Sequence, residues 1–458
     1  MIGDMQRWTP NVASIIEHAK EFHPKKEVIS RMVSGDVHRT NYEEVCIRSR
    51  KLASALEKDG YKKGDVIATL ALNTYRHLEM YYGISGMGAI CHTLNFRLHP
   101  EQAVYIINHA DDKIIFCEVP FIPIMEGLKD QLPCVEKYII LCDEADMPET
   151  GLKNAVSYEE YINNGDEDYV WPAMEDDAAC GLCYTSGTTG NPKGVLYSHK
   201  SNILHAQASL VGMPIGPDES ILMVVPLFHV LAWGIPYYGP MNGSKLVMPG
   251  MQMEGEPLFD LINKEKVTLA FGVPTIWMGL LAYCRDNNKI LTSVRNTIIG
   301  GSALSLPTLQ EFDEVHDVNV IHAWGMTEMS PLGTINVPTP EMDNMSKDEK
   351  YATGVNPCMT HPHNFYVQLL AETGISGFLF LLSAFSYVLY AALRQFKSII
   401  FRQKRPLSDY QVCLLAAILV TLWPFSPNGN FFNNWLMIVY SLPVGFYLQS
   451  IYSKKSRK

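Results

Sequence analysis

The chain has 458 residues and a formal net charge of −11, but this charge is an average over two different regions. Residues 359–458 hold nine Lys and Arg and two acidic residues, which gives +7 and leaves −18 for the rest. A difference of this size within one chain indicates separate domains. We expect no nucleic-acid partner.

The ten cysteines show neither the spacing of a metal site nor that of a disulfide framework. Cys180 and Cys183 lie in an apolar run, so we interpret them as small buried thiols in a reducing cytoplasm. The N-terminus lacks the apolar stretch of a signal peptide. The first region is therefore expected to be a cytoplasmic-type domain.

Short apolar or β-branched runs alternate with helical patterns from residue 40 to residue 330. The first series predicts strand, helix, strand, helix and strand at Val66–Leu72, Tyr75–Gly86, Ala89–Leu94, Glu101–His109 and Lys113–Glu118. A second series of predicted strands ends in turns rich in Gly or Pro: Ala178–Thr185, Ile221–Val225, Lys245–Met248, Val267–Gly272, Thr297–Ile299 and Val318–Ala323. This order predicts an α/β doubly wound core, in which ligands bind at the carboxyl ends of the strands.

Beyond residue 370 the composition changes to uncharged segments separated by basic residues, at 374–393, 410–425 and 435–451. Segments of this length can cross a bilayer as helices, the last two at the short end of the range. Five Lys and Arg follow the first segment and four follow the third, and the positive-inside rule places both groups in the cytoplasm. We predict an all-α membrane segment of about three transmembrane helices, a lipid-bilayer partner and localisation in a bacterial inner membrane.

The most specific motif is the glycine-rich hydroxyl loop Tyr184-Thr-Ser-Gly-Thr-Thr-Gly-Asn-Pro-Lys-Gly194. Its N–H groups and hydroxyls suit phosphate oxygens, and its lysine adds a positive charge. The spacing is not that of a Walker A loop, and a surface turn is the alternative. The candidate phosphate-binding residues are Thr185, Ser186, Gly187, Thr188, Thr189 and Lys193.

Three further motifs follow in order: Pro226-Leu-Phe-His-Val-Leu-Ala-Trp-Gly234, Gly300-Gly-Ser-Ala303 and His322-Ala-Trp-Gly-Met-Thr-Glu328. Together with the loop, they make residues from about 8 to 350 resemble the adenylate-forming superfamily, which includes acyl-CoA synthetases, luciferases and adenylation domains. The segments 95–100 and 229–237 are similar to short- and medium-chain acyl-CoA ligases, including enzymes for methylthiopropionate-like acids.

The resemblance implies a role for each motif. Trp324 would stack on adenine, Thr327 would contact the phosphates and Glu328 would hold Mg²⁺, chemistry that suits a flat ring, a hydroxyl and a hard carboxylate. His229 would lie beside the acyl substrate. The adenine-binding turn would comprise Gly301, Ser302, Ala303 and, beside Trp324, Gly325. Taken singly, His229 would more often be an ordinary half-buried histidine and Trp324 a core residue, so the assignment depends on the ordered set of motifs.

The implied activity is that of an acid–thiol ligase of the acyl-CoA synthetase type, with ATP, Mg²⁺, CoA and a small or medium-chain carboxylic acid. The carboxylate attacks the α-phosphate of ATP to give an acyl-adenylate, and CoA then displaces AMP. The protein would contribute mainly positioning and charge neutralisation.

In the superfamily that this chain resembles, the motif that contains Glu328 is followed by more of the main domain and by a small mobile C-terminal domain. No matching sequence follows Lys350. The missing part carries a lysine for the adenylation transition state, and one such contact is typically worth about 3–4 kcal/mol. We therefore expect residues 1–351 to form a truncated adenylating domain with weak or no ligase activity.

Residues 357–377 resemble the O-antigen ligase/polymerase family through the pair His363 and Asn364 and through Gly374 and Gly377, and the likeness extends over 354–458. His363 would be a base for an acceptor hydroxyl, and a polar turn is the alternative. We assign 352–373 to the junction with this motif and 374–458 to a membrane tail.

The alternative functions are an O-antigen ligase-like glycosyltransferase fragment and an inactive chimera. The positive-inside rule places 360–372 outside the cytoplasm, which conflicts with a cytoplasmic first domain and favours the chimera.

Overall fold

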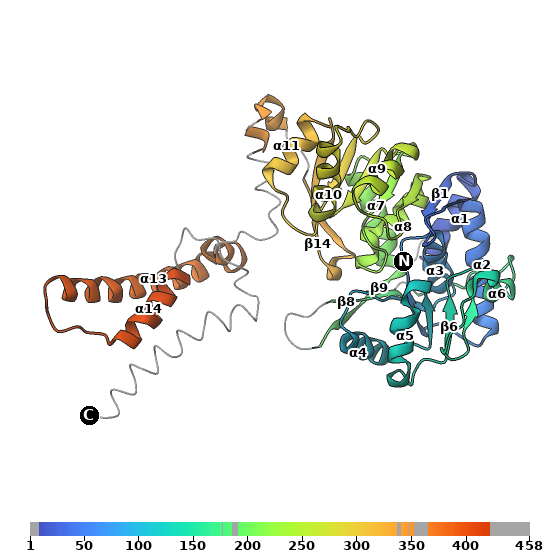
Figure 1. The fold of residues 1–458 in the computed structure, drawn as a ribbon, viewed down its shortest axis with the longest axis horizontal. Coiled ribbons are helices and arrows are strands. Elements are labelled where there is room, and N and C mark those ends of the chain that lie inside the picture. Colours follow the sequence, from blue (N-terminus) through green and yellow to red (C-terminus); the bar gives the residue numbers. More distant parts are fainter. Residues whose placement is uncertain are drawn as a thin grey trace, which may run out of the picture. The chain divides into compact units, whose positions relative to one another are not determined.

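The computed structural model describes residues 9–175, 177–185, 191–336, 340–347, 349–351 and 365–421. The chain divides along its length into two compact units, with the division after Cys358. Figure 1 traces the helices and strands in chain order. The first unit is an α/β structure and the second is helical.

A seven-stranded sheet forms one half of the first unit, with the strand order β7-β6-β5-β3-β4-β8-β9. Its strands are parallel except for the last pair, in which β9 runs antiparallel to β8. The strands are β3 (Val66–Leu70), β4 (Ile90–Thr93), β5 (Ile114–Cys117), β6 (Lys137–Ile140), β7 (Val156–Ser157), β8 (Ala179–Thr185) and β9 (Lys193–Ser198).

An eight-stranded sheet forms the other half, with the order β15-β14-β13-β12-β10-β11-β1-β2. Its two outer strands, β2 and β15, are antiparallel to their neighbours and the rest are parallel. The strands are β1 (Glu27–Arg31), β2 (Val37–Asn41), β10 (Ser220–Met223), β11 (Lys245–Met248), β12 (Leu269–Gly272), β13 (Asn296–Ile299), β14 (Asn319–Gly325) and β15 (Leu332–Ile335).

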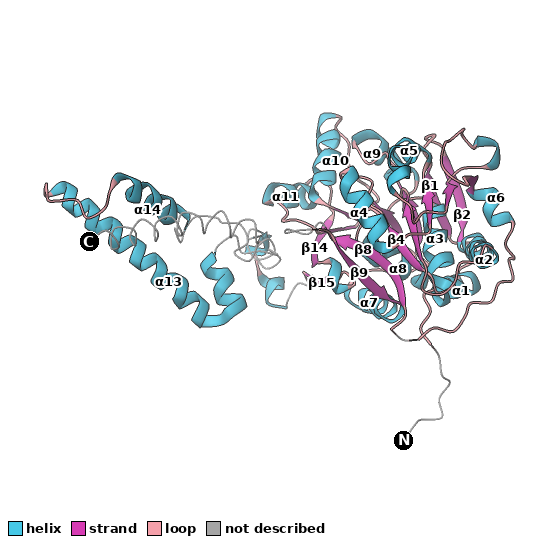
Figure 2. Ribbon diagram, turned by 90° about the horizontal axis from the view of Figure 1, so that it is seen from below, coloured by secondary structure: helices cyan, strands magenta, loops and turns pink. Residues whose placement is uncertain are grey.

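Helices surround the strands of the first unit (Figure 2). They are α1 (Ala13–Phe22), α2 (Tyr42–Lys58), α3 (Tyr75–Gly86), α4 (Pro100–Ala110), α5 (Ile122–Leu128), α6 (Tyr158–Asn163), α7 (His199–Gly212), α8 (Ile235–Asn242), α9 (Gly255–Lys264), α10 (Pro274–Asp286) and α11 (Leu306–Glu314). Local sequence accounts for their starts. For example, the Asn41 side chain accepts the backbone N–H of Glu44 at 2.9 Å, which caps α2.

Both sheets contain the same five-strand arrangement. In one, β4 and β5 flank β3, and β6 and β7 continue the sheet beyond β5. In the other, β11 and β12 flank β10, followed by β13 and β14. Each set therefore reverses its strand order once, between β3 and β5 and between β10 and β12. The crevice at the carboxyl ends of the strands at such a reversal is the usual ligand position in doubly wound folds.

The predicted α/β doubly wound core is confirmed, and most predicted strands lie within one or two residues of the observed ones. Several strands were not predicted: β6, β7, β9, the hairpin of β1 and β2, and β15, which pairs antiparallel with β14 through Trp324 and Thr334. Observed β14 extends to Gly325, two residues beyond the predicted strand.

The second unit contains α13 (Phe365–Ile400) and α14 (Asp409–Thr421). Val388 of α13 packs against Leu415 and Ile418 of α14. The Gln395 side chain lies at the turn between them, where its Oε1 accepts the N–H of Leu407 at 3.1 Å.

The prediction of an inner-membrane localisation is wrong. No helix in the described residues is both long enough and apolar enough to cross a membrane. The predicted span 374–393 lies within the longer α13, which includes the charged residues Glu372, Arg394 and Lys397, and part of its apolar surface packs in the hairpin with α14. The span 410–425 coincides with α14 up to Thr421, and the span 435–451 lies outside the described residues.

We expect the first unit to lose stability in acid because of two buried histidines, His77 and His199. Burial lowers the pKa of each to about 4, so the unfolded chain binds protons that the folded chain does not as pH falls from 6.5 to 4. Each contributes at most about 3 kcal/mol. Buried Glu118 has the opposite effect on stability. Its pKa is raised to about 7, so its protonation stabilises the folded chain as pH falls, but it is one group against two histidines.

Urea unfolding at a series of pH values measures this effect. The free energy of unfolding should fall on acidification through this range, and His77→Gln should reduce the slope. A free energy that stays constant from pH 6.5 to pH 4 would contradict the prediction.

Candidate active site

The carboxyl edge of the eight-stranded sheet carries three of the four predicted motifs. His229 lies in the loop that follows β10, Gly300 directly follows β13, and Trp324 and Gly325 end β14. Since β10 and β12 flank the strand-order reversal, this edge is where the fold favours a ligand.

The segment after His229 is a left-handed turn. Four consecutive residues from Val230 to Trp233 have φ between 47° and 58°, and Gly234 has φ 81°. Left-handed backbone costs roughly 1–2 kcal/mol for each residue with a side chain. Such strain persists only where surrounding structure enforces it, and it is common at functional sites.

The turn places the ring of Trp233 against Gly300. A Cβ atom at Gly300 would lie 3.0 Å from Cη2 of Trp233 and 2.9 Å from the carbonyl oxygen of Ala323. A side chain there would therefore displace Trp233 or β14. Gly300 thus lets the loop after β10 and the ends of β13 and β14 meet closely.

The segment from Gly325 to Leu332 forms a tight loop that carries Thr327 and Glu328. The N–H of Met326 donates to the carbonyl of Pro331 at 3.0 Å, and a Cβ atom at Gly325 would lie 2.3 Å from that same carbonyl oxygen. Gly325 is therefore required by close backbone approach. Thr327 is half-buried and Glu328 is exposed.

Two side chains from the β9–α7 segment hold this loop. The hydroxyl of buried Tyr197 donates to the carbonyl of Thr327 at 2.6 Å. His205 Nε2 accepts the N–H of Leu332 at 3.1 Å, and burial lowers the pKa of His205 to about 4, so its ring stays neutral and able to accept. The His205 ring also packs on Gly234, which connects the loop to the left-handed turn.

A cavity of about 180 Å³ brings three predicted residues together: Thr185, His229 and Thr327. They come from the hydroxyl loop, the loop after β10 and the loop after β14. Loss of water around the His229 ring lowers its pKa, which favours the neutral imidazole. These three residues thus give the cavity two hydroxyl groups and a neutral imidazole ring, and none of the three carries a negative charge.

The other predicted residues do not line this cavity. Lys193 is exposed at the start of β9, and Gly301, Ser302 and Ala303 are exposed after β13. Trp324 is half-buried and packs over Gly333, where a Cβ atom would approach its ring to 2.8 Å. Ser186, Gly187, Thr188, Thr189 and His363 lie outside the described residues.

Sequence reasoning missed a buried pair, of which His92 lines the same cavity. His92 Nδ1 lies 2.9 and 2.8 Å from the two carboxylate oxygens of Asp112, and both side chains are fully buried. Nε2 of His92 has no hydrogen-bond partner within the described part of the chain. His92 is on β4 and Asp112 precedes β5, so only the fold joins them, and their spacing in the sequence carries no motif.

With this geometry defined, the class of protein follows from an α/β fold whose candidate site lies at the carboxyl ends of its strands together with the family comparison. The family model for AMP-binding enzymes matches residues 16–360, and the chain belongs to that family.

The curated relatives support the same assignment. The medium-chain-fatty-acid–CoA ligase of Ectopseudomonas oleovorans is 44% identical over 352 residues, which cover 76% of this chain and 64% of the relative. The 3-methylmercaptopropionyl-CoA ligase of Ruegeria lacuscaerulensis is 44% identical over 353 residues, which cover 77% of this chain and 66% of the relative. The chain thus spans about two thirds of the length of these relatives or slightly less.

Among solved structures, the anthranilate CoA ligase AuaEII in complex with anthranoyl-AMP has a similar fold, with a TM-score of 0.66 and 22% identity. The similarity covers 74% of this chain and 64% of that one. These comparisons give no support to the O-antigen ligase-like resemblance of 354–458 or to the expected truncation and weak activity.

We predict that Tyr197→Phe loosens the loop from Gly325 to Leu332, because the carbonyl of Thr327 loses its donor. The loss should reduce stability by about 1 kcal/mol and speed amide hydrogen exchange in this loop. Tyr42→Phe is the matched control, because Tyr42 is also buried and its hydroxyl donates to a backbone carbonyl, that of Ser244.

Hydrogen exchange followed by mass spectrometry makes the comparison. Both variants should lose similar stability, but only Tyr197→Phe should change exchange in residues 325–332. Equal exchange in the two variants would show that the hydroxyl of Tyr197 does not hold this loop.

Proposed function

We propose that this protein activates a small or medium-chain carboxylic acid with ATP and transfers the acyl group to CoA. The observation that carries the proposal is the cavity in which Thr185, His229 and Thr327 meet at the carboxyl ends of the strands. The names of two relatives, a medium-chain-fatty-acid–CoA ligase and a 3-methylmercaptopropionyl-CoA ligase, support the substrate class.

The phosphates of ATP are bound by hydroxyl and backbone donors. Thr185 ends β8, and both it and Thr327 line the cavity. The Thr185 hydroxyl donates to the carbonyl of Lys193 at 3.4 Å, and in the proposal it turns to donate, with that of Thr327, to phosphate oxygens. Lys193 lies directly after the hydroxyl loop and contributes positive charge. In the proposal, Ser186, Gly187, Thr188 and Thr189 complete this phosphate site.

Adenine binds at the ends of β13 and β14. Gly301, Ser302 and Ala303 form the exposed turn beneath the base, and Gly301 has φ 83°, a conformation that favours glycine. Trp324 supplies the stacking ring and Gly325 lets the backbone of the next loop approach.

The metal site fits Mg²⁺ rather than a metal held wholly by the protein. Within the described residues, no group of three or more His, Cys, Asp or Glu is placed to hold a metal ion. Glu328 is an exposed single carboxylate, and Mg²⁺ is commonly held by one or two carboxylates together with substrate phosphates. When bound, Mg²⁺ neutralises the charge that develops on the phosphates.

The reaction has two steps. A carboxylate oxygen of the acid forms a bond to the α-phosphorus of ATP, and the bond to pyrophosphate breaks. The sulfur of CoA then attacks the acyl carbon, AMP leaves with the bond electrons, and the thiol proton is released. His229, with its neutral ring at the cavity wall, lies beside the acyl group and orients it, while Thr327 and Lys193 stabilise the phosphate charge.

Acid-dependent exchange between pyrophosphate and ATP tests the first step without CoA. The wild-type chain should exchange with acids between propionate and decanoate. Glu328→Gln should slow exchange by about 10²–10³-fold, the usual loss for one group that stabilises transition-state charge. It should also raise the Mg²⁺ requirement.

Glu256→Gln, an exposed glutamate on α9, is the matched control and should exchange at the wild-type rate. Absence of exchange with every acid in the series would contradict the proposed function. A Glu328→Gln variant with normal exchange and normal Mg²⁺ dependence would contradict only the role of Glu328.

A further inference from the structure

The cavity of the candidate active site has a buried histidine in its wall that the two reaction steps above do not use. His92 lines this cavity from β4, and its side chain is fully buried. Its Nε2 has no hydrogen-bond partner among the residues that the structure describes. A buried polar atom without a partner is rare in folded proteins, and beside a cavity it indicates a position that a ligand satisfies.

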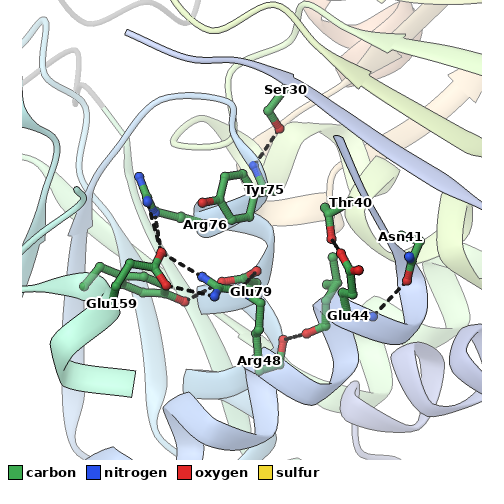
Figure 3. Close-up of polar contacts among 12 residues, drawn as sticks. Ser30, Thr40, Asn41, Glu44, Arg48, Tyr75, Arg76, Glu79 and Glu159 are labelled. Atoms are coloured by element: carbon green, nitrogen blue, oxygen red, sulfur yellow. Dashed lines mark hydrogen bonds and ion pairs between the residues drawn. The ribbon is translucent and has the colours of Figure 1, made fainter. Parts of the chain in front are cut away.

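The large ion network of the same unit shows the contrasting case, in which buried charges satisfy one another (Figure 3). Arg48 binds both oxygens of Glu159 at 2.8 and 2.9 Å and Glu79 at 2.7 Å. Arg76 binds Glu159 as well, at 3.0 Å. This network joins α2, α3 and α6 without a ligand. His92 differs because one of its two ring nitrogens is left over.

Asp112 determines which nitrogen of His92 that is. The two carboxylate oxygens lie 2.9 and 2.8 Å from Nδ1, so the Nδ1–H donates to the carboxylate and the lone pair of the neutral ring is on Nε2. The two ring nitrogens point in divergent directions, and Nε2 is therefore turned away from Asp112. A buried carboxylate in this position also stabilises the imidazolium that forms when Nε2 takes a proton, as in a Ser-His-Asp triad.

The charges around the pair are compatible with this role. Burial raises the pKa of Asp112, and the charge and hydrogen bond of His92 oppose that rise. Asp111, the acidic neighbour, is paired with Lys113 at 2.8 Å. Above neutral pH the ionised Asp112 carboxylate is favoured, and it then orients a neutral His92 ring.

The other rings of the cavity do not occupy Nε2. Tyr184 packs against the His92 ring with the centroids 5.2 Å apart, but its hydroxyl is hydrogen-bonded to Nδ1 of His109 at 2.7 Å. His229, the second histidine of the cavity wall, is exposed, so water can satisfy its ring. His92 is therefore the histidine of this wall that has both a buried carboxylate partner and an unpartnered nitrogen.

The proposed reaction needs a base at one point only. Attack of the carboxylate on ATP moves no proton, whereas the CoA thiol must lose its proton as its sulfur attacks. The cavity suits the thiol, a weakly polar group, because about 180 Å³ holds the end of a ligand rather than a whole nucleotide. Much of the remaining wall is apolar, with Leu94, Leu98, Ile106 and Phe228.

We propose that Nε2 of His92 faces this cavity and takes the proton of the CoA thiol in the second step, with Asp112 as its positioning residue. The sulfur forms a bond to the acyl carbon, the bond from that carbon to the AMP oxygen breaks, and AMP leaves with the electron pair. The thiol proton moves to Nε2, and Asp112 stabilises the imidazolium until the proton passes to solvent. This inference rests on the proposed function and assigns the base of its second step.

The test measures the two steps separately in the full chain. Transfer is followed as butyryl-CoA formed from butyryl-adenylate and CoA at pH 7.5, and activation as pyrophosphate exchange without CoA. His92→Gln should slow transfer about 10²-fold more than it slows exchange, the lower end of what a general base contributes. Asp112→Asn keeps an oxygen for the Nδ1–H but removes the charge, and it should slow transfer about tenfold more than exchange. It carries the same comparison should His92→Gln not fold.

The pH dependence separates a base from a residue that only supports the structure. A free thiol has a pKa of about 8.5, so raising the pH from 7.5 to 9 supplies thiolate without a base. The transfer deficit of His92→Gln should therefore shrink severalfold over this range. His77→Gln is the matched control, because His77 is also fully buried but lies on α3 and does not line the cavity. Its ratio of transfer to exchange should equal that of the wild type.

Equal slowing of transfer and exchange by both variants of the pair would overturn the proposal. A transfer deficit that stays constant from pH 7.5 to pH 9 would do the same, and so would wild-type exchange without any transfer to CoA. Wild-type transfer from butyryl-adenylate without exchange would instead contradict the proposed activation step, while the variants would still report on His92.

Discussion

One buried side chain, Asn73, joins the two sheets at the carboxyl ends of their strands. Its Nδ2 donates to the carbonyls of Met223 and Val225 at 2.9 and 2.8 Å, and its Oδ1 accepts the N–H of Leu227 at 2.8 Å. Asn73 lies in the turn after β3, and its partners are at the end of β10 and in the loop beyond it. The first strands of the two repeated sets are thus joined at their carboxyl ends. Removing the amide would leave three buried backbone groups without partners, at about 1–3 kcal/mol each.

This connection explains why the loop after β10 can hold a strained conformation. Leu227 is bound to Asn73, and the carbonyl of Leu227 also accepts the hydroxyl of buried Tyr81. The chain therefore enters the left-handed turn from a fixed position. It leaves the turn at Gly234 against the His205 ring and continues into α8. Strain in the turn is balanced by rigid contacts on both sides, which keeps Trp233 and His229 in place beside the ends of β13 and β14.

Period and turn chemistry were sufficient to predict most of the parallel strands, though not β1, β6 or β7, because a strand buried on both faces is a continuous apolar run that ends in glycine or proline. They were not sufficient for the edge strands β2 and β15, whose residues are mostly half-buried, or for β1, which pairs with β2. The candidate site was only partly predictable. Motif order indicated Thr185, His229 and Thr327, but Tyr197, His205 and the His92–Asp112 pair act through contacts between residues far apart in the chain. The membrane prediction failed because no helix of the described residues is both long enough and apolar enough to cross a membrane.

The two sheets show how one strand arrangement supports different sites. After β13 the chain continues as Gly300, Gly301 and Ser302, which allow close backbone approach and expose N–H groups and a hydroxyl. After β6 the corresponding residues are Leu141, Cys142 and Asp143, and the carbonyl of Leu141 is taken by Arg76 at 3.2 Å. Side chains at this end replace the open backbone, and a carboxylate replaces the hydroxyl. The same edge of the fold therefore carries open backbone and a hydroxyl in one sheet and paired side chains in the other, through the residue types that follow each strand.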